Sequence, residues 1–158
     1  MNRWDEYFLK VATAVASNSK CLSRQLGAVI VRDNIIVSTG YNGPPKGVRH
    51  CDIRFKSKQC PRKEIGAKSG ERLDMCIAGH AEGNAIASAA YLGARTAQAI
   101  MYCSWIVPCK ECMIDIINAG IIEVVVTEVV YYHEISKILA RESGVAVRPY
   151  GVSRFANI

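Results

Sequence analysis

The alternation of strand-like and helix-like segments after Gly79 is the feature that most restricts what this chain can fold into. Short runs of apolar and β-branched residues predict buried strands near 99–104, 121–127 and 145–148. The segments between and before these strands predict helices, at 80–92, 109–119 and 133–142. Such an alternation indicates a mixed α/β sheet that is covered by helices on both faces.

The first forty residues predict a helix followed by a hairpin. An opening helix that ends near Ser19 is indicated by apolar residues at helical spacing, namely Trp4, Phe8, Val11 and Val15. Residues 26–32 and 35–40 are strand-like, and Asp33-Asn34 between them tolerates the positive φ angles of a tight turn. We therefore expect an antiparallel pair at one side of the sheet.

The length and the irregular middle of the chain set the domain organisation. With 158 residues, half of them hydrophobic, the chain suits one compact domain, which we place at 1–150 with a C-terminal tail at 151–158. Periodicity disappears between Tyr41 and Gly79, and a long irregular segment inside a compact domain usually serves a function or is held by a metal. We expect residues 44–78 to form such an insert, stapled by a metal.

Seven cysteines indicate a reducing compartment. An odd number cannot all pair internally, and the N-terminus lacks the basic and apolar pattern of a signal peptide. No stretch approaches the roughly 18 apolar residues of a membrane span, so we expect a cytoplasmic protein without a membrane partner. The net charge of +6 allows an anionic partner, although solubility alone would also account for it.

Two cysteines and a histidine stand at the predicted starts of two helices. His80 begins one helix, while Cys109 and Cys112 lie at i and i+3 on one face of the other. Three nitrogen and sulfur ligands would leave the fourth position of a tetrahedral zinc ion open for water, as in catalytic zinc sites. Glu82 is then expected to act as a proton shuttle. The alternatives are a closed structural zinc site or a helix cap with a buried histidine.

The arrangement H-x-E followed by P-C-x-x-C is the known signature of zinc-dependent nucleobase deaminases. The chain resembles the cytidine and deoxycytidylate deaminase superfamily, and within it the deoxycytidylate (dCMP) deaminases, over about 19–147. The resemblance rests on five stretches, which are 27–31 (GAVIV), 38–43 (STGYNG), 80–86 (HAEGNAI), 108–112 (PCKEC) and 119–121 (AGI). It implies a three-layer α/β/α cytidine-deaminase-like fold with a mixed central β-sheet.

The resemblance also implies a reaction and a substrate site. The reaction is hydrolytic deamination of dCMP, in which zinc-activated water attacks C4 of cytosine and ammonia and dUMP are released, supplying thymidylate synthesis. Asn42 would bind the sugar, although it could equally be a turn residue, and Trp105 could stack on the base or simply pack. Family members often carry Arg where this chain has Ser23, with Arg24 next. The full set of expected substrate-binding residues is Asn42, Ala81, Ser23, Arg24, Ser104, Trp105 and Tyr132.

Four further cysteines are candidates for a second metal. Some bacteriophage dCMP deaminases hold a structural zinc in this insert, and by resemblance Cys21 and Cys51 match two of its ligand positions. Cys60 and Cys76 would complete the set. The alternative is that these side chains are free thiols or small buried apolar groups. The insert's basic residues are assigned either to an effector's phosphates or to the solvated surface.

The remaining expectations concern partners and rival functions. We expect a homo-oligomer, with dCTP and dTTP as possible effectors and Mg²⁺ as a possible companion of such a nucleotide. One rival is a deaminase of the same fold that acts on another cytosine or adenine nucleotide or on nucleic acid. The other is a zinc-stabilised nucleotide-binding module without catalysis. Aromatic residues make up only 8% of the chain, which argues against a surface that stacks nucleic-acid bases.

Overall fold

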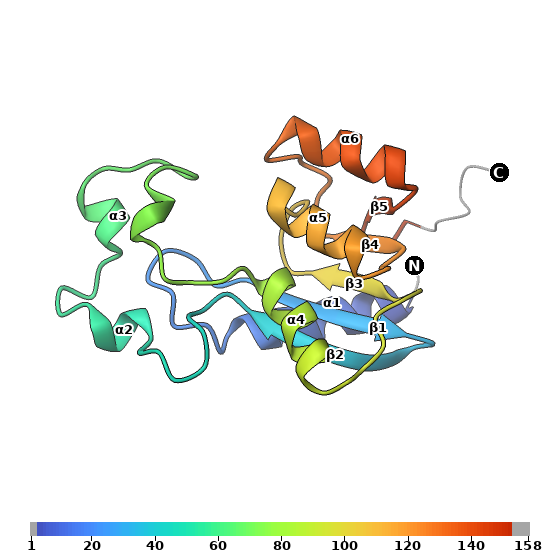
Figure 1. Ribbon diagram of the computed structural model, residues 1–158, viewed down its shortest axis with the longest axis horizontal. Helices are drawn as coiled ribbons and strands as arrows, with labels where there is room; N and C mark the ends of the chain where they lie inside the picture. The colour runs from blue at the N-terminus through green and yellow to red at the C-terminus, as the bar shows by residue number, and fades with distance from the viewer. Residues whose placement is uncertain (1–2, 153–158) are drawn as a thin grey trace.

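The computed structural model describes residues 3–152 and contains a sheet-bearing body and a projecting insert (Figure 1). The strands are β1 (Gly27–Arg32), β2 (Ile35–Tyr41), β3 (Ile100–Cys103), β4 (Glu123–Val126) and β5 (Ala146–Pro149). The helices of the body are α1 (Arg3–Ala16), α4 (Ala81–Tyr91), α5 (Lys110–Asn118) and α6 (Glu134–Ser143). Between β2 and α4 lie α2 (Cys51–Arg54), α3 (Pro61–Glu64) and the 3₁₀ helix η1 (Leu73–Met75).

The five strands form one mixed sheet in the order β2-β1-β3-β4-β5. Strand β1 is antiparallel to both β2 and β3, while β3, β4 and β5 run parallel. The predicted hairpin is confirmed, because Asp33 and Asn34 join β1 and β2 with φ angles of 53° and 60°. The mixed sheet expected from the strand–helix alternation is therefore present.

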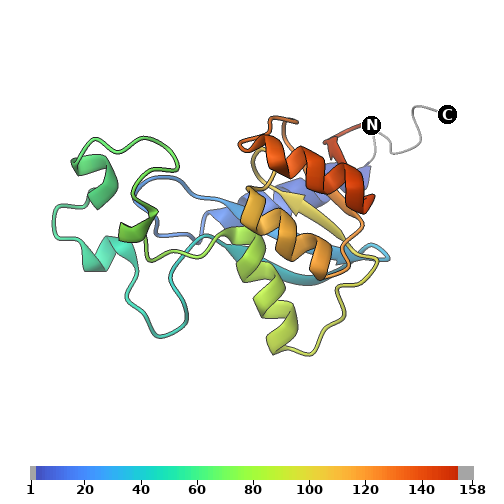
Figure 2. The same ribbon diagram turned by 45° about the horizontal axis from the view of Figure 1, so that its top comes forward.

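Alternate residues of the central strands face two different helical layers. Ala28 and Ile30 of β1 belong to the apolar core shared with α4, α5 and α6, whereas Val29 and Val31 pack with α1. Figure 2 shows α4, α5 and α6 on one face of the sheet and α1 on the other. This alternation is what the period of two along a strand requires when both faces are buried, and it confirms the three-layer α/β/α architecture.

Glycine allows α4 to approach the sheet closely. A Cβ atom on Gly40 of β2 would lie 2.2 Å from the backbone nitrogen of Ala85 and 2.3 Å from the carbonyl oxygen of Ala81. No larger residue fits this contact without a shift of the helix. The start of α4, where His80 lies, is thus positioned by a backbone contact with the sheet.

The predicted helix ends agree with the structure except for α1. Gly120 and Gly144 follow α5 and α6 with φ angles of 73° and 76°, as expected of glycines that end helices. Helix α1 ends at Ala16 instead of near Ser19. The amides of Ser17, Asn18 and Ser19 continue with hydrogen bonds to carbonyl oxygens three residues back, so the chain leaves the helix through a tightened last turn.

The insert leaves and rejoins the body at one point. Gly43 and Gly79 form an antiparallel bridge with N···O distances of 3.1 and 2.8 Å, and the side-chain amide of Asn84 donates to the carbonyl of Tyr41 at 2.9 Å. Within residues 44–78, all of which the structure describes, short helices form but no residue is buried. The segment that was expected to be irregular thus also contains α2, α3 and η1, single-turn helices that are too short to show a period.

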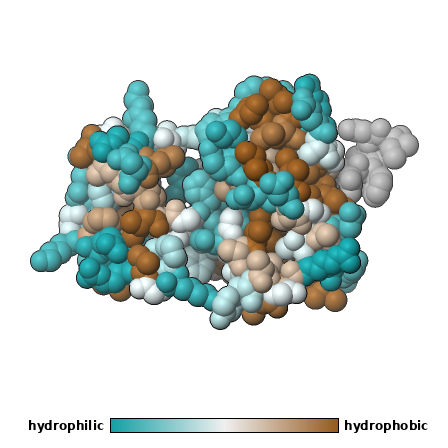
Figure 3. Space-filling model, in the orientation of Figure 1, coloured by the Kyte–Doolittle hydropathy of each residue, from teal (hydrophilic) through white to brown (hydrophobic). Residues whose placement is uncertain are grey.

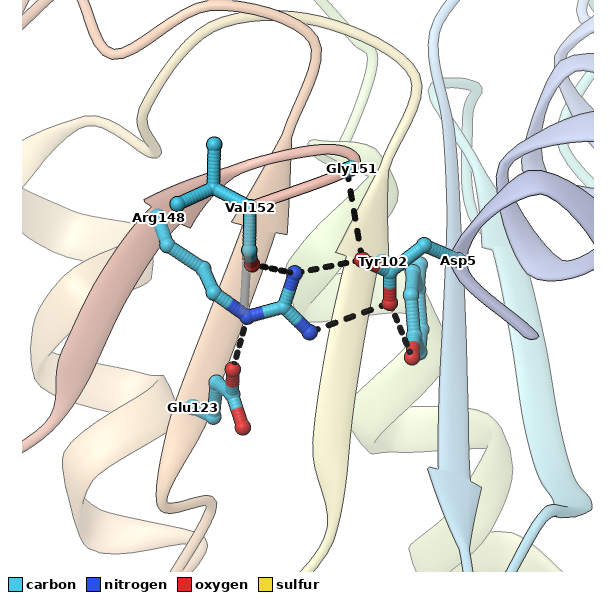
Figure 4. A network of polar contacts seen from close by, with 6 residues as sticks. All are labelled: Asp5, Tyr102, Glu123, Arg148, Gly151 and Val152. Atoms are coloured by element: carbon cyan, nitrogen blue, oxygen red, sulfur yellow. Dashed lines mark hydrogen bonds and ion pairs between the residues drawn. The ribbon is translucent and has the colours of Figure 1, made fainter. Parts of the chain in front are cut away.

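A buried ionic network joins α1 to the end of the sheet (Figure 4). The guanidinium of Arg148 contacts both carboxylate oxygens of Asp5, at 2.5 and 3.0 Å, and also pairs with Glu123. Tyr102 donates to Asp5 at 3.1 Å, and Asp5 is fully buried. Because each member has several partners, the network fastens the first helix to β3, β4 and β5.

The lengths of the helices and the last described residues bear on the expected absence of a membrane span and on the predicted tail. Among the helices formed by residues 3–152, none has the length and apolar character needed to cross a membrane. The structure describes the predicted tail only at Gly151 and Val152. The former donates its amide to Asp5 at 3.3 Å, and the latter accepts from Arg148 at 2.8 Å. Residues 153–158 lie outside the described residues.

Candidate functional site

The three predicted zinc ligands meet where α4 and α5 begin. His80 is the N-cap residue of α4, Cys109 is the N-cap residue of α5, and Cys112 lies one turn into α5. Both helices start at the side of the body that faces the insert (Figure 1). The positive ends of two helix dipoles therefore converge on this point, which favours thiolate over thiol.

The geometry of this cluster fits a zinc ion. The Sγ atoms of Cys109 and Cys112 each lie 3.3 Å from Nδ1 of His80, and all three donor atoms are within 4.8 Å of one another. Zinc bonds of 2.0–2.3 Å at tetrahedral angles would separate neighbouring sulfur and nitrogen ligands by about 3.5 Å. Two thiolates and one imidazole are also a common donor set for a catalytic zinc site that keeps one position open.

The protonation of the two cysteines is tightly linked. Hydrogen bonds from Cys112 and His80 lower the pKa of the Cys109 thiol to about 4, and contact with Cys109 raises the pKa of His80. The hydrogen bond with Cys109 and burial raise the pKa of Cys112. Without a cation, one negative charge is thus held at Cys109, and a dication at this point would stabilise the second thiolate as well.

Glu82 lies in the first turn of α4 beside these ligands. Its Oε2 atom is 3.7 Å from the Sγ of Cys112, so the carboxylate is close to the cluster without being part of it. Burial raises the pKa of Glu82 above its ordinary value. A carboxyl group beside a metal cluster can accept a proton and donate it again, as general acid–base catalysis requires.

A cavity of about 680 Å³ opens over this cluster and extends to the insert. It is large enough for a nucleotide-sized ligand. Figure 3 shows the hollow between the insert and the body. The cavity is lined by His80, Cys109 and Glu82, while Cys112 is buried just behind them. It is also lined by every residue that the resemblance assigned to the substrate, namely Ser23, Arg24, Asn42, Ala81, Ser104, Trp105 and Tyr132.

Asn42 is buried and holds the neighbouring loop in place. Its Oδ1 accepts a hydrogen bond from the amide of Leu26 at 2.7 Å, and its Nδ2 donates to the carbonyl of Arg24 at 2.9 Å. Ser104 fixes the end of the same loop, because its Oγ accepts from the amide of Gly27 at 2.9 Å. Both side chains line the cavity, and both also shape the segment that carries Ser23 and Arg24.

The outer wall of the cavity is partly aromatic. The Arg24 guanidinium lies 5.9 Å from the centre of the Trp105 ring, and the Trp105 side chain is 47% exposed. Tyr132 reaches the insert, because a Cβ on Gly70 would come within 2.0 Å of its hydroxyl oxygen. By contrast Ala81 is buried in the core and reaches the cavity only at its edge. The exposed rings can therefore contact a ligand over the metal cluster.

Cys21 and the three cysteines of the insert, Cys51, Cys60 and Cys76, all line a second, much smaller cavity of about 30 Å³. Burial, together with the neighbouring sulfurs of Cys21, Cys76 and Cys60, raises the pKa of Cys51. Among residues 3–152, only His80, Cys109 and Cys112 meet the mutual distance of 4.8 Å. The four sulfurs of Cys21, Cys51, Cys60 and Cys76 thus surround one small space but lie farther apart than the first three ligands.

Sequence reasoning did not assign the insert's basic residues to the large cavity. Arg62, Lys63 and Lys68 line it from the side opposite the metal cluster. A signal was present in the sequence, because Cys60-Pro61-Arg62-Lys63 repeats the order of Cys21-Leu22-Ser23-Arg24, with a basic residue three positions after a cysteine. In a segment without regular secondary structure, the sequence does not predict where a lysine side chain points. The position of these residues at the cavity is therefore seen only in the structure.

Residues 2–128 match the sequence model of the family described as the cytidine and deoxycytidylate deaminase zinc-binding region. The deoxycytidylate deaminase of Saccharomyces cerevisiae is 38% identical over 148 residues, which are 93% of this chain and 45% of that protein. The enzyme of the same name from Schizosaccharomyces pombe is 36% identical, covering 93% of this chain and 44% of that protein. The chain thus spans less than half the length of these fungal relatives.

Two further comparisons cover most of both chains. Mouse deoxycytidylate deaminase is 34% identical over 155 residues, or 93% of this chain and 79% of the mouse protein. The crystal structure of dCMP deaminase from the cyanophage S-TIM5, in complex with dCMP and dUMP, superposes with a TM-score of 0.72 at 22% identity. It covers 94% of this chain and 98% of the phage chain, which shows that the two share a fold.

Proposed function

Because this chain belongs to the cytidine and deoxycytidylate deaminase family, we propose that it catalyses the zinc-dependent hydrolysis of dCMP to dUMP and ammonia. The proposal makes it a hydrolase that acts on the C–N bond of a cyclic amidine and supplies dUMP for thymidylate synthesis. The observation that carries the proposal is the convergence of His80, Cys109 and Cys112 beside Glu82, next to a nucleotide-sized cavity that His80, Cys109 and Glu82 line.

In this proposal His80, Cys109 and Cys112 hold the catalytic zinc and Glu82 moves protons. When bound, zinc supplies Lewis acidity that activates water at neutral pH. The carboxylate of Glu82 takes a proton from the attacking water and returns it to the departing amine. Its position supports this role, because the carboxylate lines the cavity and lies 3.7 Å from the Sγ of Cys112.

The proposed substrate lies between the metal cluster and the insert. Asn42 and the loop that it holds would contact the sugar, with Ser104 at the end of that loop. Trp105 and Tyr132 expose ring faces to the same cavity and would flank the base, near Ala81. Ser23 and Arg24 would face the phosphate, since both line the cavity and contact the insert through Lys63 and Ser69.

We also propose that Cys21, Cys51, Cys60 and Cys76 hold a second, structural zinc. Their arrangement around one small space of about 30 Å³ supports this proposal, since the space can accommodate an ion. A metal there would stabilise an insert that buries no side chain of its own. Elemental analysis should find two zinc ions per wild-type chain and one in a Cys60→Ser variant. One zinc in both would exclude the second site.

The assembly, its regulation and its location belong to the same proposal. Exposed apolar side chains on and beside α4, at Tyr91 (76% exposed) and Leu92 (70%), support a homo-oligomer. Regulation by dCTP and dTTP, with Mg²⁺ accompanying the nucleotide, stays a prediction. A cytoplasmic location suits a site whose thiol ligands must stay reduced.

A substrate panel tests the proposed function. Ammonia release from dCMP, deoxycytidine, dCTP and a short single-stranded oligonucleotide is measured with zinc-loaded protein. The proposal expects dCMP to have the highest kcat/KM. Preference for the oligonucleotide would favour a nucleic-acid deaminase, and no release from any compound would favour a binding module without catalysis.

A further inference from the structure

The insert presents an organised loop to the active-site cavity. Arg62 donates from Nε to the carbonyl of Glu71 at 2.7 Å and from Nη2 to the carbonyl of Lys68 at 3.3 Å. The amide of Lys68 donates to the Glu71 carboxylate at 2.8 Å. The charged groups of Arg62 and Glu71 are thus engaged in holding the loop, and the loop has a defined shape without burying apolar residues.

This loop contacts the segment 23–26, which is also held by the hydrogen bonds of Asn42. Lys63 donates from Nζ to the carbonyl of Ser23 at 3.4 Å, and Arg24 donates from Nη2 to the hydroxyl of Ser69 at 3.4 Å. These two contacts cross between the insert and the segment of Ser23 and Arg24. Lys63 therefore lies beside the residues proposed to face the nucleotide, although it is distant from them in the sequence.

The two ends of the cavity differ in charge. At the metal end lie Glu82 and the paired side chains of Lys110 and Glu111, whose charged atoms are 3.3 Å apart. At the insert end lie Arg24, Lys63 and Lys68, and within residues 3–152 none of these three forms an ion pair with a carboxylate. Arg62 and Glu71 line the same end, and their opposite charges offset each other. The three remaining positive charges favour a phosphate group there.

We propose that Lys63 determines specificity by binding the 5′-phosphate of the substrate, together with Arg24. The insert then selects a nucleoside monophosphate over the free nucleoside, while the body carries out the deamination. This inference rests on the proposed deamination of dCMP at the same site. The contact with Ser23 supports Lys63 over Lys68, because it places the ammonium group directly at the loop that Asn42 orders.

The experiment compares Lys63→Met with a matched control. Methionine keeps the apolar stem but removes the charge. Lys56→Met removes an exposed lysine of the same insert that does not line the cavity. For Lys63→Met, kcat/KM for dCMP should fall by about 10- to 100-fold, mainly through KM, as expected for the loss of a hydrogen bond to a charged group. Its kcat/KM for deoxycytidine should not change.

Two further measurements sharpen the result. Lys63→Arg should recover most of the activity toward dCMP because it restores a positive charge, and Lys56→Met should match the wild type with both substrates. The dissociation constant for dUMP, measured by calorimetry, should rise in Lys63→Met by the same factor as KM. An unchanged dissociation constant would contradict the proposal.

The outcomes separate this inference from the proposed function. If the wild type does not prefer dCMP over deoxycytidine, the proposed substrate is wrong. If the wild type prefers dCMP and Lys63→Met keeps the same preference, the substrate stands and the role of Lys63 is wrong. An equal loss of kcat/KM for dCMP and deoxycytidine in Lys63→Met would also contradict the role of Lys63. Such a pattern would indicate a disturbed insert and not a lost phosphate contact.

Discussion

The body and the insert of this chain are held together by different means. In the body, side chains from β1, β3 and β4 are fully buried between two helical layers, among them Ile30, Met101 and Val124. In the insert no residue from 44 to 78 is buried, and its loops are held by hydrogen bonds such as that from Arg62 to the carbonyl of Glu71. The candidate metal ligands are thus carried by the tightly packed body. The residue proposed to bind the phosphate, Lys63, is carried by the polar insert.

The difference also affects how stability is distributed. Burial of apolar surface contributes about 25 cal/mol per Å², so a region that buries little has little resistance to local opening. The candidate metal ligands His80, Cys109 and Cys112 begin helices that pack on the sheet, and they should stay in place even if the insert opens. The phosphate end of the cavity should depend on the insert.

The largest expected effect on the body comes from the buried network of Asp5. Burial alone would raise the pKa of Asp5, but the hydrogen bonds and charge of Arg148 outweigh it and hold the pKa below its ordinary value of 3.8. Ionised Asp5 therefore stabilises the folded state above about pH 4, and this stabilisation is lost as the pH falls through the lowered pKa. Asp5→Asn should cost about 3–5 kcal/mol at neutral pH, measured by urea unfolding.

A matched control is Asp33→Asn in the exposed β1–β2 turn. Its carboxylate is 87% exposed and only 3.9 Å from Arg32, so the change should stay within about 0.5 kcal/mol. The Asp5→Asn variant should also lose the acid-dependent part of the wild-type unfolding curve below pH 4. An equally steep acid dependence in that variant would show that the network does not control the acid stability of the body.

A smaller effect is expected from Gly40→Ala, which changes the contact between α4 and the sheet. The new methyl group would clash with the backbone of Ala81 and Ala85, so the helix must shift at a cost of about 1–3 kcal/mol. Gly83→Ala is the control on α4 itself, where the nearest atom would be 4.0 Å away and helix propensity should favour alanine. Thermal unfolding should show a lower Tm for Gly40→Ala only, and equal values would contradict the contact.

The smallest effect on the free energy of unfolding is expected from Cys60→Ser, because this substitution should change only the insert. If the four cysteines hold a metal, Cys60→Ser should speed amide hydrogen exchange in 44–78 and leave β1, β3 and β4 protected. Cys109→Ser should leave exchange in the insert unchanged. Equal exchange of the insert in wild type and Cys60→Ser would mean that its hydrogen bonds suffice without a metal.

The structure of the body could be predicted from the sequence more fully than that of the insert. Periodicity predicted the helices and strands of the body, and the Asp33-Asn34 turn and the Gly120 stop were confirmed, because these depend on local chemistry. The approach of α4 to Gly40 could not be predicted, since it depends on residues that meet only in the fold. The family match confirms the deaminase resemblance, whereas the roles of single residues such as Asn42 remain predictions.

The insert was less predictable for a physical reason. Its single-turn helices are too short to show a period, and its side chains take direction from contacts such as that of Lys63 with Ser23. Asn42 illustrates the same limit within the site, because both polar atoms of its side chain bind backbone groups of the 24–26 loop, which the sequence does not reveal. Metal-binding motifs can be recognised in a sequence because their ligands have a fixed spacing. The residues that line a cavity have no fixed spacing and are found only in the structure.

The most direct test of the whole account is the activity of Glu82→Gln at equal zinc content. Glutamine keeps the size of the side chain but has no carboxylate to accept the proton, and His80, Cys109 and Cys112 are untouched. The account predicts the same zinc content as the wild type and a rate of ammonia release from dCMP that is lower by about 100- to 10,000-fold. Turnover within a few-fold of the wild type at equal zinc content would contradict it.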